Sequence, residues 1–305
     1  AEKGAAGKKP PPPEDTRKIY FSKKIKGKLN ERDVEMTQYF VWFIPLLSLV
    51  QVILLIVMIV VGGFESFERN PFGGPPVATL VQFGGKHTEL IRQGQVWRLI
   101  TPIFLHSGIV HLLINLCMQI MSGLPSERYH GAHFMIPLYL LCGLFGNALS
   151  ALFLPSRVTV GVSSSLCGLF GLMLVDVLQN HEVMPGWKQQ AFCLVMHIVV
   201  IVAIGAILPS LDNWAHSGGF VMGLMIAIGF STRIELAKRK NQIPYRVISA
   251  VAIVIALGVV LVLLFTVSGD FCPVCANINC IQATGLCDGF NANITDLINN
   301  VAMMG

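Results

Sequence analysis

Three short stretches of the sequence combine residue types that act together in hydrolysis. The first contains His111 and, four residues later, Asn115, which share one face of a helix. Gly161 and Ser163 form a Gly-x-Ser sequence, and His216 follows in the third stretch. A serine beside a histidine base can attack a carbonyl, and amide or imidazole N–H groups can stabilise the oxyanion that forms. These residue types indicate acyl-transfer chemistry if the fold brings them together.

Each stretch also has a purely structural alternative. His111 and Asn115 could form a hydrogen-bonded pair that holds two membrane helices together. A lone serine in a membrane helix commonly bonds to a carbonyl of its own helix. A single motif therefore leaves both the catalytic and the structural interpretation open. Only the relative placement of the three stretches in the fold can distinguish the two.

Two aspartates are candidates for a third catalytic residue. Asp176 comes thirteen residues after Ser163, which is about 20 Å deeper along a helix at 1.5 Å per residue. Asp212 lies one turn before His216, but aspartate at a helix start usually accepts a hydrogen bond from the first turn as an N-cap. We therefore expect a Ser–His dyad, with Asp212 as a cap.

The chain that carries these residues has unusually few charges. Of its 305 residues, 53% are hydrophobic and 13% are charged, whereas about a quarter of the residues of a soluble domain are charged. Seven stretches lack Asp, Glu, Lys and Arg, and each can hold the roughly 17–25 residues that cross a bilayer. They are 36–64, 99–126, 129–156, 158–175, 189–211, 213–232 and 247–269. The pattern predicts an all-α polytopic membrane protein and argues against a soluble enzyme, a porin or a nucleic-acid-binding protein.

The basic residues predict how this bundle is oriented. Ten of the 22 Lys and Arg residues precede the first span, five lie in 233–246, and none follows 269. By the positive-inside rule the N-terminus and the 233–246 loop face the cytoplasm, and the C-terminus lies outside. The basic, Pro-containing arm 1–35 lacks the apolar stretch of a signal peptide. We expect it to be largely disordered, with binding to anionic lipid as the alternative.

The candidate residues fall at one depth of the predicted bundle. The second, fourth and sixth spans run inward, and each carries its polar residues near the outer end. Polar side chains inside spans are costly unless they pair or line a water-filled cavity. A shared depth therefore favours one site open to the outside. The expected regions are the arm 1–35, the first membrane helix 36–64, an outer interfacial loop 65–98, the remaining core 99–232, the basic loop 233–246, the seventh membrane helix 247–268 and the outer tail 269–305.

Cysteines and a sequon mark the tail. Four cysteines could form two disulfides in an oxidising compartment, in any of three pairings, and a zinc site is the alternative. The disulfide candidates are Cys272, Cys275, Cys280 and Cys287. Asn293 begins an Asn-Ile-Thr triplet, a candidate for glycosylation on the predicted outer side.

Taken in order, the motifs resemble the rhomboid family of intramembrane serine proteases. The resemblance runs from Trp97 to Gly223. Its motifs are Trp97-Arg98, His106 with His111-xxx-Asn115, Glu127-xxx-Gly131, Gly161-x-Ser163, and Ala215-His216 with Gly219-xxx-Gly223. The resemblance implies a bundle of six core transmembrane helices plus a seventh, C-terminal helix, as in eukaryotic secretase-type members.

The family's site roles map onto this chain one residue at a time. The resemblance makes Ser163 the nucleophile and His216 the base, with Asn115 and His111 assisting the oxyanion. It also makes Glu127 a polar anchor in the loop after the second helix. No metal or organic cofactor is implied.

The sequence departs from the family pattern at three positions around the serine. Val162 and Ser164 stand where many members have a small residue and a glycine, and Cys167 stands where an aromatic residue often packs on the base. A smaller side chain at position 167 would hold His216 less firmly. We therefore expect either modest activity or a different packing partner for His216.

The resemblance implies that the substrates are single-pass membrane proteins, cut near the outer end of their spans. Residues that weaken a helix, such as Gly, Ala, Ser or Pro, would expose the scissile bond. The main alternative is an inactive rhomboid-like protein that binds membrane clients, and a channel or transporter is a third reading. The plasma membrane and the Golgi or related endomembranes are the expected locations, and the oligomeric state is left open.

Overall fold

The computed structural model describes most of the chain between the arm and the tail. The described residues are 23–25, 28–30, 38–181, 186–207, 211–231, 242–267, Cys272 and Cys275. Within the basic arm, β1 (Lys23–Ile25) and β2 (Lys28–Asn30) pair as a short antiparallel hairpin, which the expectation of a largely disordered arm did not include. The rest of the arm lies outside the described residues.

The other regular elements of the described chain are helices. The long helices are α1 (Phe43–Gly62), α6 (Ala132–Phe153), α7 (Ser163–Gln179), α8 (Trp187–Ile207), α9 (Asn213–Phe230) and α10 (Ile243–Thr266). A further long segment is continuous and consists of α4 (Ile109–Met118), the π-helical η3 (Gln119–Gly123) and α5 (Leu124–His130). The shorter elements are α2 (Val77–Gln82), α3 (Thr88–Arg92), and the 3-10 turns η1 (Val96–Leu99) and η2 (Thr101–Phe104).

Five helical segments in the described part of the chain are long and apolar enough to cross a membrane. They are Phe43–Gly62, Ile109–His130, Ala132–Phe153, Trp187–Ala206 and Ile243–Thr266. The helix α7 is apolar but has only 17 residues, and α9 begins with the polar run that contains Asn213 and His216. Together with these two helices, the segments correspond to the seven predicted spans.

The second span begins later than the charge pattern predicts. Residues 99–108 contain η2 and an extended stretch, and α4 starts only after Gly108. Pro102 lies within η2, and the N–H of Ile109 donates to the carbonyl of Gly73 in the preceding loop at 2.8 Å. The helix therefore starts at the loop contact, although the sequence has no charge there.

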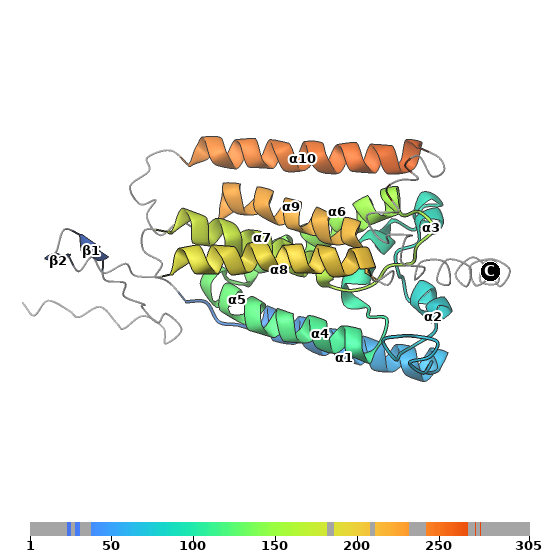
Figure 1. The fold of residues 1–305 in the computed structure, drawn as a ribbon. Coiled ribbons are helices and arrows are strands. Elements are labelled where there is room, and N and C mark those ends of the chain that lie inside the picture. Colours follow the sequence, from blue (N-terminus) through green and yellow to red (C-terminus); the bar gives the residue numbers. More distant parts are fainter. Residues whose placement is uncertain are drawn as a thin grey trace, which may run out of the picture.

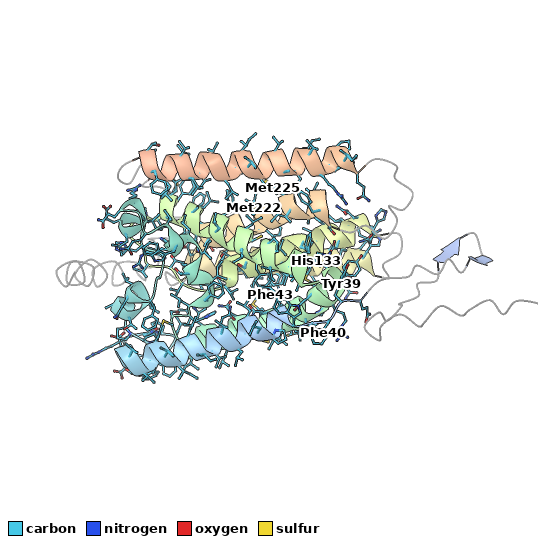
Figure 2. The ribbon with its side chains drawn as sticks, turned by 180° about the vertical axis from the view of Figure 1, so that it is seen from behind. Tyr39, Phe40, Phe43, His133, Met222 and Met225 are labelled. Carbon is cyan, nitrogen blue, oxygen red and sulfur yellow. A yellow bond between two sulfur atoms is a disulfide. The ribbon has the colours of Figure 1, made fainter. Side chains whose placement is uncertain are left out.

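The helices α6, α7 and α9 pack against one another at the centre of the bundle (Figure 1). The C-terminal helix α10 packs along α9 and α6 on one side, and α1 and α4 lie on the other (Figure 1). Met222 is fully buried in the core, and Figure 2 shows it beside Met225 between the helices. Side chains on α1, α8 and α10 that point away from this core are mostly apolar and exposed, as expected of a lipid-facing surface.

The glycines of α9 allow it to approach α7 closely. A Cβ atom at Gly219 would lie 1.9 Å from the carbonyl oxygen of Ser164, and one at Gly223 would lie 2.1 Å from that of Gly168. No side chain fits in either gap. The Gly-xxx-Gly spacing thus sets the distance between the two helices that carry Ser163 and His216.

Glu127 fixes the start of α1. Its carboxylate accepts hydrogen bonds from the backbone N–H groups of Trp42, Phe43 and Ile44 at 2.7–2.9 Å, and its side chain is fully buried. These are donors that a helix start leaves without a partner. The expectation that Glu127 lies in a loop after the second helix is wrong, because it is on α5.

The same end of α1 is held by aromatic contacts. The ring of Tyr39 lies 5.2 Å from that of His133, and the ring of Phe43 lies 5.4 Å from that of Tyr139. Figure 2 labels Tyr39, Phe43 and His133 at this end of the bundle. The contacts join α1 to α6.

Candidate active site

Ser163 and His216 meet across the α7–α9 contact. Ser163 is the first residue of α7, and His216 lies one turn into α9. The Nε2 atom of His216 is 2.9 Å from the Oγ of Ser163. A hydrogen bond of this length is what a base needs in order to take the proton of a nucleophile.

The second ring nitrogen of His216 makes no hydrogen bond to a carboxylate among the described residues. Its Nδ1 is buried and has no hydrogen-bond partner in the structure. Asp212 caps α9 instead, since its Oδ1 accepts from the N–H of Ala215 at 3.0 Å. The arrangement is that of a dyad.

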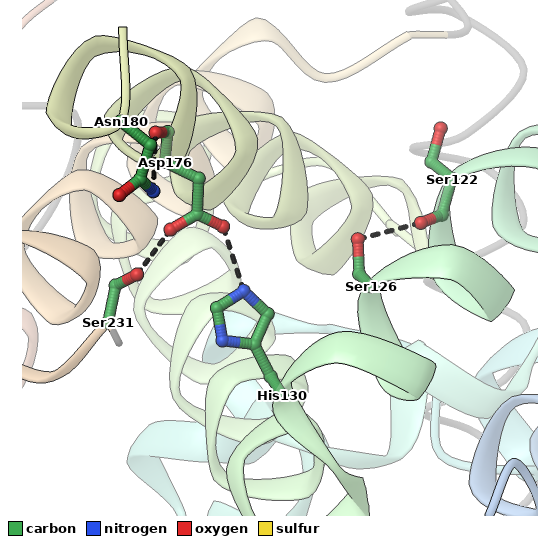
Figure 3. A network of polar contacts seen from close by, with 6 residues as sticks. All are labelled: Ser122, Ser126, His130, Asp176, Asn180 and Ser231. Carbon is green, nitrogen blue, oxygen red and sulfur yellow. Dashed lines mark hydrogen bonds and ion pairs between the residues drawn. The ribbon is translucent and has the colours of Figure 1, made fainter. Parts of the chain in front are cut away.

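Asp176 is engaged at the other end of α7. His130 Nε2 lies 2.8 Å from its Oδ2, and the hydroxyl of Ser231 donates to its Oδ1 (Figure 3). The side-chain amide of Asn180 donates to the backbone carbonyl of Asp176 at 2.9 Å, also drawn in Figure 3. Asp176 therefore takes no part in orienting His216, as the helix geometry predicts.

His111 and Asn115 flank the serine from α4. A Cβ atom at Gly161 would lie 2.8 Å from Cε1 of His111 and 3.7 Å from Nδ2 of Asn115, so both side chains reach the backbone two residues before Ser163. Gly161 also has φ +128°, which L side chains rarely adopt. Both its conformation and its missing side chain are required for this approach.

Hydrogen-bond donors around the serine lack acceptors. The Nδ2 of Asn115 is buried without a partner in the structure. The backbone N–H of Ser163 lies in the first turn of α7, where N–H groups have no acceptor within the helix. His111 is held by its Nδ1, which lies 2.8 Å from the hydroxyl of Ser107. Unpaired donors beside a serine are suited to stabilising an oxyanion.

A cavity opens onto His111, Ser163 and His216. His111, Ser163 and His216 line it together with side chains from the loop before α4 and from the segment before α7. The other lining residues are Glu65, Arg69, Asn70, Pro71, Phe72, Val77, Leu80, Ser107, Arg157, Val158, Thr159, Val160, Leu211 and Asp212. An extended peptide could reach the dyad from this side.

Charged groups outside the spans lie close to the dyad. Lys86 has no exposed surface, and burial lowers the pKa of its ammonium group to about 8. Burial alone would raise the pKa of Asp212, but the nearby Lys86 and hydrogen bonds from Ser150, Ala215 and Thr159 hold it below its ordinary value. No sequence motif singled out Lys86, because a lysine after two loop glycines is normally solvated.

Trp97 and Arg98 lie away from the dyad. Trp97 is half exposed on η1. The guanidinium group of Arg98 donates to the carbonyls of Val81 and Gly85 at 2.6 and 3.0 Å and is buried. Arg98 thus ties η1 to the segment that leads into Lys86.

The three departures from the family pattern are all buried. Val162 has no exposed surface, and the hydroxyl of Ser164 is buried without a partner in the structure. Cys167 is buried on α7 as a free thiol. The side chain of Ser165, next to Ser164, donates to the carbonyl of Tyr139 at 2.7 Å.

The tail is described at two cysteines. The sulfur atoms of Cys272 and Cys275 lie 2.01 Å apart, the distance of a disulfide. The indole of Trp214, two residues before His216, donates to the carbonyl of Cys275 at 3.0 Å. The remaining candidates, Cys280, Cys287 and Asn293, lie outside the described residues.

Comparison with known proteins finds similar sequences across the region that carries these residues. A family model described as the Rhomboid domain matches residues 93–233, which include His111, Asn115, Ser163 and His216. RHOMBOID-like protein 2 of Arabidopsis thaliana is 33% identical over 219 residues, 66% of this chain and 68% of that protein. RHOMBOID-like protein 7 of the same plant is 36% identical over 183 residues, 59% of this chain and 58% of that protein.

One similar protein is named as inactive. Inactive rhomboid protein 1 of Homo sapiens is 33% identical over 195 residues, 62% of this chain and 22% of that protein. The chain spans only 53–62% of the length of several of its plant relatives. RHOMBOID-like protein 2 aligns with this chain over most of its own length, and the match to the family model spans all four candidate site residues. The chain therefore belongs to the rhomboid family.

Proposed function

We propose that the protein is an intramembrane serine endopeptidase that cleaves single-pass membrane proteins near the outer end of their spans. The observation that carries this proposal is the 2.9 Å contact between His216 Nε2 and Ser163 Oγ, which opens onto a cavity. Membership of the rhomboid family supports intramembrane proteolysis in general.

The proposed reaction uses the dyad twice. Ser163 Oγ attacks the peptide carbonyl while its proton passes to His216 Nε2. Asn115 Nδ2, His111 and the Ser163 N–H donate hydrogen bonds to the oxyanion. His216 then gives its proton to the leaving amine. In the second half His216 takes a proton from water, which attacks the acyl-enzyme, and the released Ser163 Oγ takes that proton back.

The topology and location belong to the same proposal. The basic arm and the 233–246 loop would face the cytoplasm, and the cavity and the cysteine-containing tail would face outward. An outward tail would account for a Cys272–Cys275 disulfide and for glycosylation at Asn293. The plasma membrane or the Golgi and related endomembranes would be the location.

The alternative function is that of an inactive member that binds membrane clients. The relative named Inactive rhomboid protein 1 makes this a real competitor. What favours the protease is that both dyad residues are present and in contact. The buried Asn115 Nδ2 without a partner also favours the protease, because an oxyanion would complete its hydrogen bond.

The two functions are separated by cleavage in liposomes. Wild type and Ser163→Ala are reconstituted with a single-pass substrate that carries Gly and Ala near the outer end of its span. We expect cleavage by the wild type within that part of the span and none by the variant. Equal cleavage by both proteins would contradict the proposal, and substrate binding without cleavage by the wild type would favour the inactive alternative.

A further inference from the structure

The buried Lys86 belongs to the outer loop and contacts the segment that joins α6 to α7. Its Nζ donates to the carbonyl of Leu154 after α6 at 3.0 Å. Its backbone exchanges two hydrogen bonds with Thr159, N–H to carbonyl at 2.9 and 3.2 Å. A lysine without exposed surface is rare unless an anion balances it.

Asp212 is electrostatically coupled to this ammonium group, and Thr159 joins the two residues, since its backbone pairs with that of Lys86 and its hydroxyl donates to Asp212. The Asp212 Oδ2 accepts from the hydroxyls of Ser150 and Thr159, the latter at 2.8 Å. Its Oδ1 accepts from Ala215 N–H. These donors fix the position of the carboxylate, and Lys86, together with Arg157, supplies the positive charge that compensates its burial.

The same aspartate holds the backbone of the base. The carbonyl of Asp212 accepts the N–H of His216 at 3.0 Å, so both ends of Asp212 bond to the first turn of α9. Thr159, which joins Lys86 to Asp212, lies four residues before Ser163 in the segment that enters α7. The network therefore links the nucleophile and the base to one point of the outer loop.

We infer that Lys86 is a positioning residue for His216: as the counter-charge of the Asp212 cap, it fixes the first turn of α9 at the distance from which His216 reaches Ser163. The inference rests on the proposed function, because positioning is of use only if the dyad reacts. It adds a residue that neither the motifs nor the resemblance includes.

The inference predicts a decline of reactivity at alkaline pH. The ammonium of Lys86 has a pKa of about 8, so its proton leaves as the pH rises through that value. Asp212 stays ionised and then keeps, among the described residues, only Arg157 as a positively charged neighbour. Titration of the other charged groups near Lys86 and Asp212 does not explain a fall in reactivity near pH 8. Burial lowers the pKa of His87 from 6.5, so it is already neutral, and Arg157 keeps its charge.

The test measures the rate at which a fluorophosphonate probe labels Ser163 in the purified full chain between pH 6 and pH 10. For the wild type we expect a rate that falls as the pH rises above about 8. Lys86→Met should label about tenfold more slowly at pH 7, within the range that a small misplacement of a catalytic group produces. Its rate should show no decline near pH 8.

A double variant distinguishes positioning from damage. With Asp212→Asn there is no charge to compensate, so Lys86→Met with Asp212→Asn should label several-fold faster than Lys86→Met alone. Asp212→Asn alone should lack the decline above pH 8, which keeps the test open if Lys86→Met does not fold. An effect of the double variant equal to the product of the single effects would contradict the inference.

The matched control is Thr88→Val. Thr88 is buried two residues after Lys86, and its hydroxyl donates to the carbonyl of Ala151 on α6 at 3.0 Å. The loss of that bond should lower the melting temperature and leave the pH profile unchanged. A wild-type rate and profile in Lys86→Met would overturn the positioning role alone. Labelling of Ser163→Ala at the wild-type rate would instead overturn the proposed function.

Discussion

Two clusters in this protein contain serine, histidine and aspartate, and they lie at opposite ends of α7. The inner cluster is the one at the C-terminal end of α7 and the outer cluster the one at its N-terminal end. At the inner cluster both carboxylate oxygens of Asp176 have a partner, one in His130 and the other in Ser231 (Figure 3). At the outer cluster, His216 contacts Ser163 while its own Nδ1 has no partner in the structure. The same three residue types thus form a closed network in one place and an open site in the other.

The difference shows which features point to chemistry. The inner cluster satisfies its polar atoms with one another, which is what stabilises a buried network. The outer cluster keeps donors unpaired and borders a cavity, so a substrate can complete its hydrogen bonds. Unsatisfied atoms beside a cavity, rather than residue types, separate a candidate active site from a structural network.

The largest expected effect separates the two clusters directly. His216→Ala should lower kcat/KM by about a thousandfold or more because the nucleophile loses its base. Asp176→Asn should leave the activity of the folded protein unchanged and lower the free energy of unfolding by about 1.5–3 kcal/mol. Cleavage assays and thermal unfolding in detergent measure the two effects. A loss of turnover in Asp176→Asn equal to that in His216→Ala would remove the distinction.

A smaller loss is expected from the oxyanion donors. Asn115→Ala removes one preorganised donor and should lower kcat about 100- to 1000-fold, with little change in KM. The measurement is steady-state cleavage of the model substrate. The control is Ser126→Ala on α5, the continuation of α4 that carries Asn115. Ser126 donates only to the carbonyl of Ser122 at 2.8 Å. An unchanged kcat in Asn115→Ala would indicate that this residue only contributes to helix packing.

The smallest effect concerns the aspartate of the outer cluster. Because Asp212 has a pKa held below its ordinary value of 3.8, its charge stabilises the fold above that value, and this contribution is lost as the pH falls through the lowered pKa. Asp212→Asn should therefore cost about 2 kcal/mol near pH 7, because it weakens the cap and leaves the buried Lys86 without its negative partner. The cost should shrink in strong acid. Melting temperatures at the two pH values measure it, and a pH-independent difference would argue against an ionised cap.

The sequence predicted the outer cluster better than the elements that support it. Ser163 and His216 could be placed at one depth because each stands near the start of a charge-free stretch, and helix rise excluded Asp176. The start of the second span could not be placed, because the break at Gly108 comes from a contact with Gly73. A count of charges does not detect such a tertiary contact.

The environments of two supporting residues also could not be predicted from the sequence. Glu127 resembles an ordinary charge near the end of a span, yet it caps α1, which lies more than 80 residues away. Lys86 resembles a solvated loop lysine, yet it is fully buried. In both cases the environment is created by segments distant in sequence. Local pattern therefore identified the candidate site residues but not the buried charged residues that hold the neighbouring segments.

The most direct test of the account is the identity of the serine that reacts. The purified protein is treated with a fluorophosphonate, digested, and analysed by mass spectrometry for the modified peptide. The account predicts modification of Ser163 in the wild type, none at Ser231 of the inner cluster, and no labelling after His216→Ala. Modification of another serine, or labelling of Ser163 that persists at the wild-type rate without His216, would contradict the central claim that Ser163 and His216 form the reactive pair.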